Sequence, residues 1–71
     1  MRGEQVMKEL LLTFEITDQH PLDAALARML ECLDKFDEKD VVKALRLCQR
    51  RYRRVMLVDI LREVREQKGG V

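Results

Sequence analysis

The sequence predicts an all-α fold: a small helical bundle built on a central antiparallel helical hairpin, with a long or kinked C-terminal helix. Apolar residues recur at steps of three and four along both halves of the chain, which is the period of a helix with one buried face. Aromatic residues are 4% of the 71 residues and tryptophan is absent, so the core must be largely aliphatic. We expect one helical domain over residues 1–71, near the lower size limit for independent folding.

The first two helices are expected over about residues 4–16 and 21–36. Residues 17–20 form a natural linker between them, because the β-branched residues before it weaken helix propensity. Pro21 fits the first position of the second helix, and the charge of Asp23 suits its first turn. The expected apolar face of the first helix consists of Val6, Met7, Leu10, Leu11 and Phe14.

The second and third helices have apolar residues at the same steps of four, three, four and three. Asp37 is the expected N-cap of a third helix over residues 38–52. The short loop makes the two helices antiparallel neighbours, and the matching steps predict packing at about +20°. In the second helix these residues are Leu22, Leu26, Met29, Leu33 and Phe36. In the third helix and beyond they are Val41, Leu45, Cys48, Tyr52 and Val55.

The chain after Tyr52 has two alternatives, because the apolar face changes near residues 55 and 56. A last helix over about residues 54–68 is expected, and Gly69 is a plausible stop. A continuous helix from residue 38 to 67 would be about 45 Å long, against a diameter of roughly 28 Å for a domain of this size. A break is therefore favoured by length, whereas the absence of Gly, Pro, Asn or Ser argues against a sharp one. Both forms stay open.

An arginine belt, defined as the five arginines within residues 46–54, is the most distinctive local feature: Arg46, Arg50, Arg51, Arg53 and Arg54. Lys39 and Lys43 extend it toward the start of the third helix. Residues 1–40 hold ten acids and five bases, a net charge of −5, and residues 41–71 hold three acids and nine bases, a net charge of +6. The belt is therefore interpreted as a solvated face that pairs with acids of the first half, as a site for an acidic protein surface, or as a phosphate-binding strip.

The second apolar face, formed by Leu57, Ile60, Leu61 and Val64, needs a cover if the helix does not break. That cover is the first helix or a second chain. We therefore expect a non-catalytic protein–protein interaction, adaptor or oligomerisation module, such as a homodimer or a subunit of a complex. These four residues would bind the partner's apolar surface, and the belt would steer an acidic partner. The alternative is a small nucleic-acid-binding regulator that uses the belt.

Catalytic, metal and cofactor sites are not expected. The chain has a single histidine, His20, and no serine, and its acidic loop lacks the glycine and the terminal glutamate of a calcium loop. Cys32 and Cys48 have no metal-ligand spacing and are expected as free thiols, buried or half-buried. No small-molecule substrate is expected. The apolar runs are too short for a membrane span or a signal peptide, so we expect no membrane association and an intracellular protein, cytoplasmic or nuclear.

Overall fold

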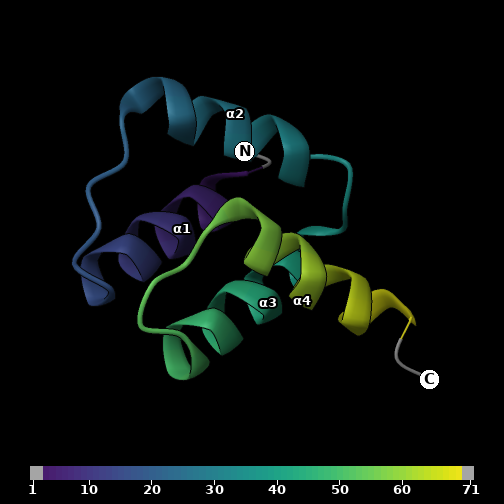
Figure 1. The fold of residues 1–71 in the computed structure, drawn as a ribbon. Helices are drawn as coiled ribbons and strands as arrows, with labels where there is room; N and C mark the ends of the chain where they lie inside the picture. The colour runs from purple at the N-terminus through teal and green to yellow at the C-terminus, as the bar shows by residue number, and fades with distance from the viewer. Residues whose placement is uncertain (1–2, 70–71) are drawn as a thin grey trace.

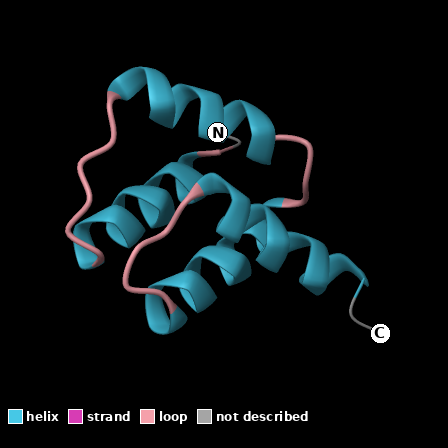
Figure 2. Ribbon diagram, in the orientation of Figure 1, coloured by secondary structure: helices cyan, strands magenta, loops and turns pink. Residues whose placement is uncertain are grey.

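The computed structural model describes residues 3–69, with side chains as far as Gln67. Its four helices are α1 (Glu4–Ile16), α2 (Asp23–Leu33), α3 (Glu38–Arg51) and α4 (Leu57–Gly69) (Figure 1). All regular structure in this part of the chain is helical, which confirms the predicted all-α class (Figure 2). Within residues 3–69, no helix combines the length and the apolar character needed to cross a membrane.

Helix α3 packs against both α1 and α4, and these are the two most extensive contacts between helices in the described part of the chain. On the α1 side, Arg46 reaches Glu9 and Gln49 reaches Thr13, so the two helices run in the same direction. On the other side, Arg51 reaches Glu63 near the middle of α4. The antiparallel hairpin predicted for residues 21–52 is thus not confirmed as the centre of the bundle.

The hydrophobic core explains this difference. Helix α3 has four buried apolar residues. Helix α2 has one, Leu33, and its other apolar residues that contact the core are only partly buried. A helix with so little buried surface lies at the edge of the bundle rather than at its centre. The buried hydrophobic residues are Val6, Leu10, Phe14, Leu33, Val41, Ala44, Leu45, Cys48, Val55, Ile60 and Val64.

The ends of α2 differ from the prediction at both sides. Leu22 has extended backbone angles (φ −68°, ψ 154°) and is the N-cap, so Pro21 precedes the helix instead of opening it. The helix ends at Leu33, and the N–H of Phe36 then turns back to the Leu33 carbonyl at 3.1 Å. At the next helix the prediction is confirmed, because Asp37 is the N-cap of α3.

The predicted long or kinked C-terminal helix is two separate helices. Helix α3 ends at Arg51, and the extended backbone of Tyr52 (φ −113°, ψ 140°) takes the chain into a loop over residues 52–56. The side-chain amide of Gln19 holds this loop: Val55 N donates to Gln19 Oε1 at 2.6 Å, and Gln19 Nε2 donates to the Val55 carbonyl at 3.0 Å. Val55 is only 1% exposed, so a side chain between α1 and α2 satisfies backbone groups that are largely shielded from water.

Helix α4 begins with a cap from its own first turn. Asp59 Oδ2 accepts the backbone N–H of Met56 at 2.9 Å, and the Ile60 N–H bonds to the Met56 carbonyl at 3.2 Å. A carboxylate at this position also suits the positive end of the helix dipole. The arginines at 53 and 54 favour helix, but the Gln19 bonds and this cap stabilise the break.

Candidate interaction surfaces

Two arginines of the belt are bound to acids of the same chain. Arg46 Nη2 lies 3.3 Å from Glu9 Oε2 of α1, and Arg51 Nη1 lies 3.3 Å from Glu63 Oε1 of α4. Both carboxylates are almost buried, whereas both arginine side chains remain more than half exposed. The expected pairing with acids of the first half therefore holds for Arg46, while Arg51 pairs within the second half.

A polar network between α1 and α3 surrounds Glu9. Its carboxylate accepts hydrogen bonds from Gln5 at 3.2 Å, from Arg46 at 3.3 Å and from Gln49 at 3.2 Å. Gln49 also donates to the hydroxyl of Thr13 at 3.0 Å. This network was not predicted from the sequence. Its signal was the placement of Glu9 and Thr13 on the same helical face as the buried apolar residues of α1.

The other belt residues, Arg50, Arg53 and Arg54, are exposed and have no ion pair within the described part of the chain. Lys39 and Lys43 are exposed on α3 in the same way. Four bases follow one another along the solvent side of α3 and are called the basic row below: Lys39, Lys43, Arg46 and Arg50.

The four apolar residues predicted to bind a partner are buried or partly buried within the single chain. Ile60 and Val64 are 0% exposed and belong to the core of the single chain. Leu61 is partly buried against the same core, and Leu57 is partly buried at the start of the helix. The chain's own core therefore covers most of this face, chiefly through α3 rather than through the first helix or a second chain, which were the expected covers for an unbroken helix.

Exposed apolar side chains gather at a different place, around the two loops of residues 17–22 and 52–56. Six large apolar residues are exposed in the described part of the chain: Leu11, Leu12, Ile16, Leu22, Met56 and Val58. The last four belong to these loops or to the helix turns next to them. The two loops and these turns, residues 16–22 and 52–58, are called the loop end below.

An open groove of about 550 Å³ lies between the two loops of the loop end. Phe14 and Met29 line it from the helices, and Met56 and Leu57 line it from the start of α4. Arg54 belongs to the same lining, so one predicted apolar contact and one predicted basic contact meet there. The Gln19–Val55 hydrogen bonds hold the two sides of this groove in register.

The two cysteines are free, as expected, and differ in burial. Cys48 is fully buried and Cys32 is partly buried. Burial, together with the nearby carboxylates of Glu63 and Asp59, raises the pKa of the Cys48 thiol from 9.0 to about 11. Because the thiolate is the reactive form, Cys48 is an inert packing residue at neutral pH.

The two cysteines of the folded chain should therefore react with a thiol reagent at different rates. At pH 8 an alkylating reagent is expected to modify Cys32 readily, and Cys48 only at the rate of unfolding. Mass spectrometry of peptides after timed quenching measures both rates, and the Cys32→Ala variant isolates the slow one. In urea the two thiols should react alike. Rapid labelling of Cys48 in the folded chain would contradict its burial beside Glu63.

Two surfaces of this protein are thus distinct: the basic row on α3 and the loop end, where apolar side chains surround a groove. The two surfaces share no residue, so substitutions can test each of them separately. No family model, curated protein or solved structure significantly matches this chain.

Proposed function

We propose that the chain is a non-catalytic protein–protein interaction module that self-associates or joins a complex as a subunit, with the loop end as its contact surface. The observation that carries the proposal is a groove with an apolar lining that includes the exposed Met56. Three further exposed apolar residues each directly adjoin a lining residue along the chain: Ile16, Leu22 and Val58. Leu22 is 78% exposed and Met56 is 63% exposed. Exposed apolar side chains that cluster in this way are typical of surfaces that another protein covers.

The loop end also has the charged surroundings of an interface. Arg53 and Arg54 are exposed beside the apolar groups, and such a rim steers association more than it adds affinity. Asp18 and Arg54 both line the groove, and a two-fold axis that passes between them would place the carboxylate of one copy opposite the guanidinium of the other. The methionine is an adaptable side chain that fills an irregular partner surface well.

The loop end is rigid enough to act as a preformed surface. Gln19 bonds to both backbone groups of Val55, and Asp59 caps the helix that follows. Ordering a flexible loop on binding would cost affinity, and these bonds have already ordered the loop. Leu57 and Arg54, which line the groove, remain proposed partner contacts. Ile60 and Val64 are no longer proposed as contacts, because they are buried in the core of the single chain.

Light scattering at two protein concentrations tests the proposal. We expect the mean mass to rise with concentration, and we expect Leu22→Glu or Met56→Glu to abolish that rise, because a charge at an apolar contact must be desolvated. Both residues are exposed, so the helical circular dichroism signal should not change. Leu11→Glu is the matched control, since Leu11 is exposed on α1 away from the loop end.

A chain that stays monomeric at both concentrations would rule out self-association. An equal effect of Leu11→Glu would show that the loop end is not the contact surface. The rival function, nucleic-acid binding through the arginine belt, predicts steeply salt-dependent binding to duplex or single-stranded nucleic acid. Titration with both probes at low and high salt therefore accompanies the light scattering, and absence of binding at low salt would exclude the rival.

A further inference from the structure

The basic row lies on the side of α3 that no other helix covers. Its four residues follow at steps of four, three and four, so at ~100° per residue they lie within about 60° of one another. On the same helical wheel the centre of the row is roughly 180° from the centre of the buried residues of α3. These buried residues are Val41, Ala44, Leu45 and Cys48.

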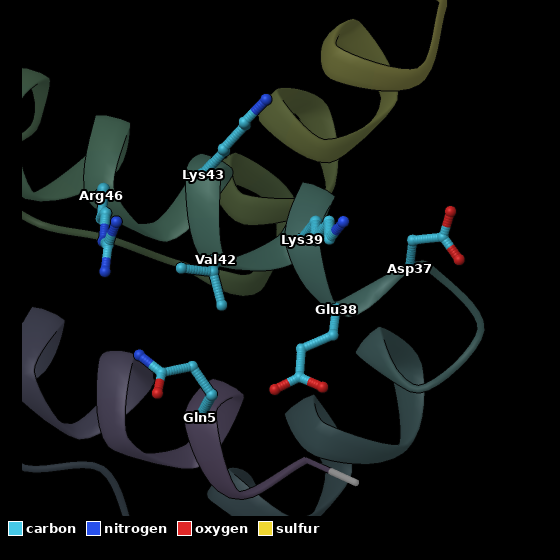
Figure 3. Close-up of a pocket in the computed structure, with 7 residues that line it drawn as sticks. All are labelled: Gln5, Asp37, Glu38, Lys39, Val42, Lys43 and Arg46. Carbon is cyan, nitrogen blue, oxygen red and sulfur yellow. The ribbon is translucent and has the colours of Figure 1, made fainter.

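A groove runs beside this row, between α3 and the first turns of α1 (Figure 3). It has a volume of about 730 Å³ and is open to solvent along one side. Val42 points into it from α3, and Gln5 faces Val42 from α1. Lys39, Lys43 and Arg46 belong to its lining together with Asp37 and Glu38, so an apolar contact point lies among three bases and two acids.

The positive charge of the row is only partly compensated within the chain. Arg46 is held by Glu9 at 3.3 Å, and this ion pair fixes one end of the groove. Lys39, Lys43 and Arg50 have no ion pair within the described residues. Three unpaired cations on one exposed strip produce a field that attracts and orients an acidic partner.

We propose that this groove and the basic row beside it bind an acidic helical segment of another protein, with an aliphatic side chain on Val42 and carboxylates on Lys39, Lys43 and, beyond the groove, Arg50. A partner helix with carboxylates at the same steps of four, three and four would present them at the same rise, about 6, 4.5 and 6 Å. Such a helix places one acid opposite each base when the two helices lie side by side. This surface is separate from the loop end, and the inference goes beyond the proposed contact made there.

Two other occupants fit the groove less well. In a two-fold pairing of two copies through this face, Lys43 and Arg46 of one copy would meet the same residues of the other, and like charges would repel. Asp37 and Glu38 line the same groove and repel any anion. A nucleic acid carries a phosphate at every nucleotide and could not avoid them, whereas a helical segment can carry its carboxylates only opposite the bases. Val42 would give a phosphate backbone nothing to bind, whereas it suits an aliphatic side chain.

Fluorescence anisotropy with a synthetic peptide tests the proposal. The probe is a labelled amphipathic helical peptide with glutamates at steps of four, three and four and leucines beside them. We expect it to bind the wild-type chain at low salt and to weaken as salt is added. Replacing its glutamates with glutamine should abolish binding. The double variant Lys39→Glu, Lys43→Glu should bind the probe at least about tenfold more weakly.

The matched control is the double variant Arg28→Glu, Arg65→Glu, which changes the net charge equally on exposed residues of α2 and α4. It should bind the peptide within about twofold of wild type, since the two charges lie outside the groove. Equal weakening in both double variants would overturn the proposal, because it would show that net charge alone binds the peptide. Absence of binding to wild type at low salt would overturn it as well.

Two further readouts separate this inference from the alternatives. Leu22→Glu should keep full peptide binding, and Lys39→Glu with Lys43→Glu should keep the association state of wild type, because the loop end is a different surface. Failure of self-association therefore leaves the groove proposal standing, and the reverse also holds. If a 20-base-pair DNA duplex binds through the row more tightly than the peptide does, the groove is a phosphate-binding surface and the acidic-segment proposal is wrong.

Discussion

The Ile60→Ala variant is expected to lower the free energy of unfolding by about 2–5 kcal/mol, the range for truncating a buried aliphatic residue. Ile60 is 0% exposed and lies on α4, where it packs in the same core as Val64. The substitution removes apolar contacts and leaves a cavity, since close-packed neighbours relax only partly. For a chain of this size such a loss is a large fraction of the total stability. Urea denaturation followed by circular dichroism measures it.

Val58→Ala is the matched control for this prediction. Val58 is a β-branched residue on the same helix but is exposed, so its truncation should change the stability by less than about 0.5 kcal/mol. The stronger variant, Ile60→Glu, should lose the helical signal at all protein concentrations, because it buries a carboxylate without a partner. If Ile60→Glu instead stayed folded and only dissociated an oligomer, α4 would be an interface helix and its position in the core would be wrong.

The Gln19→Ala variant is expected to lower the free energy of unfolding by about 2–4 kcal/mol, because it leaves two buried backbone groups without partners. Gln19 accepts the N–H of Val55 at 2.6 Å and donates to its carbonyl at 3.0 Å. Val55 is 1% exposed, so its backbone groups have little access to water while Gln19 is in place. Amide hydrogen exchange at Val55 should accelerate together with the loss of stability measured in urea.

Two variants show whether both bonds matter. Gln19→Glu keeps an acceptor for the Val55 N–H but cannot donate to the carbonyl when it is ionised, so its loss should lie between those of wild type and Gln19→Ala. Gln5→Ala is the control, because Gln5 is exposed and makes one local bond to Glu9. It should cost less than about 0.5 kcal/mol. A Gln19→Ala variant as stable as the control would mean that the loop is held by Val55 packing alone.

The helices with one clear apolar face were the easiest part of the fold to predict from the sequence. Helix α1 has the predicted bounds, and Asp37 caps α3 where the acidic first turn suggested a start. Helix α2 is shorter than its apolar steps suggested, because Leu22 and Phe36 lie outside it. Steps of three and four indicate which residues share a face, but they do not tell whether another element covers that face.

The candidate surfaces were predictable only in part. The arginine belt was visible in the sequence. Which of its arginines form ion pairs was not, because the pairs of Arg46 and Arg51 depend on where Glu9 and Glu63 lie after folding. The four predicted apolar contacts were found as a stripe, yet α4 buries Ile60 and Val64 in the core. The loop end had no sequence signal at all, since its apolar residues come from two loops that are distant along the chain.

The sequence by itself determined the all-α class, the aliphatic core, the start of α3 and the concentration of positive charge on it, because these depend on local spacing and composition. The tertiary structure alone decided the break at residues 52–56. Its physical reason is a pair of hydrogen bonds between Gln19 and Val55, which are 36 positions apart. These bonds and the burial of Val55 outweigh the local helix preference of the arginines, which had left the choice between a break and a continuous helix open in the sequence.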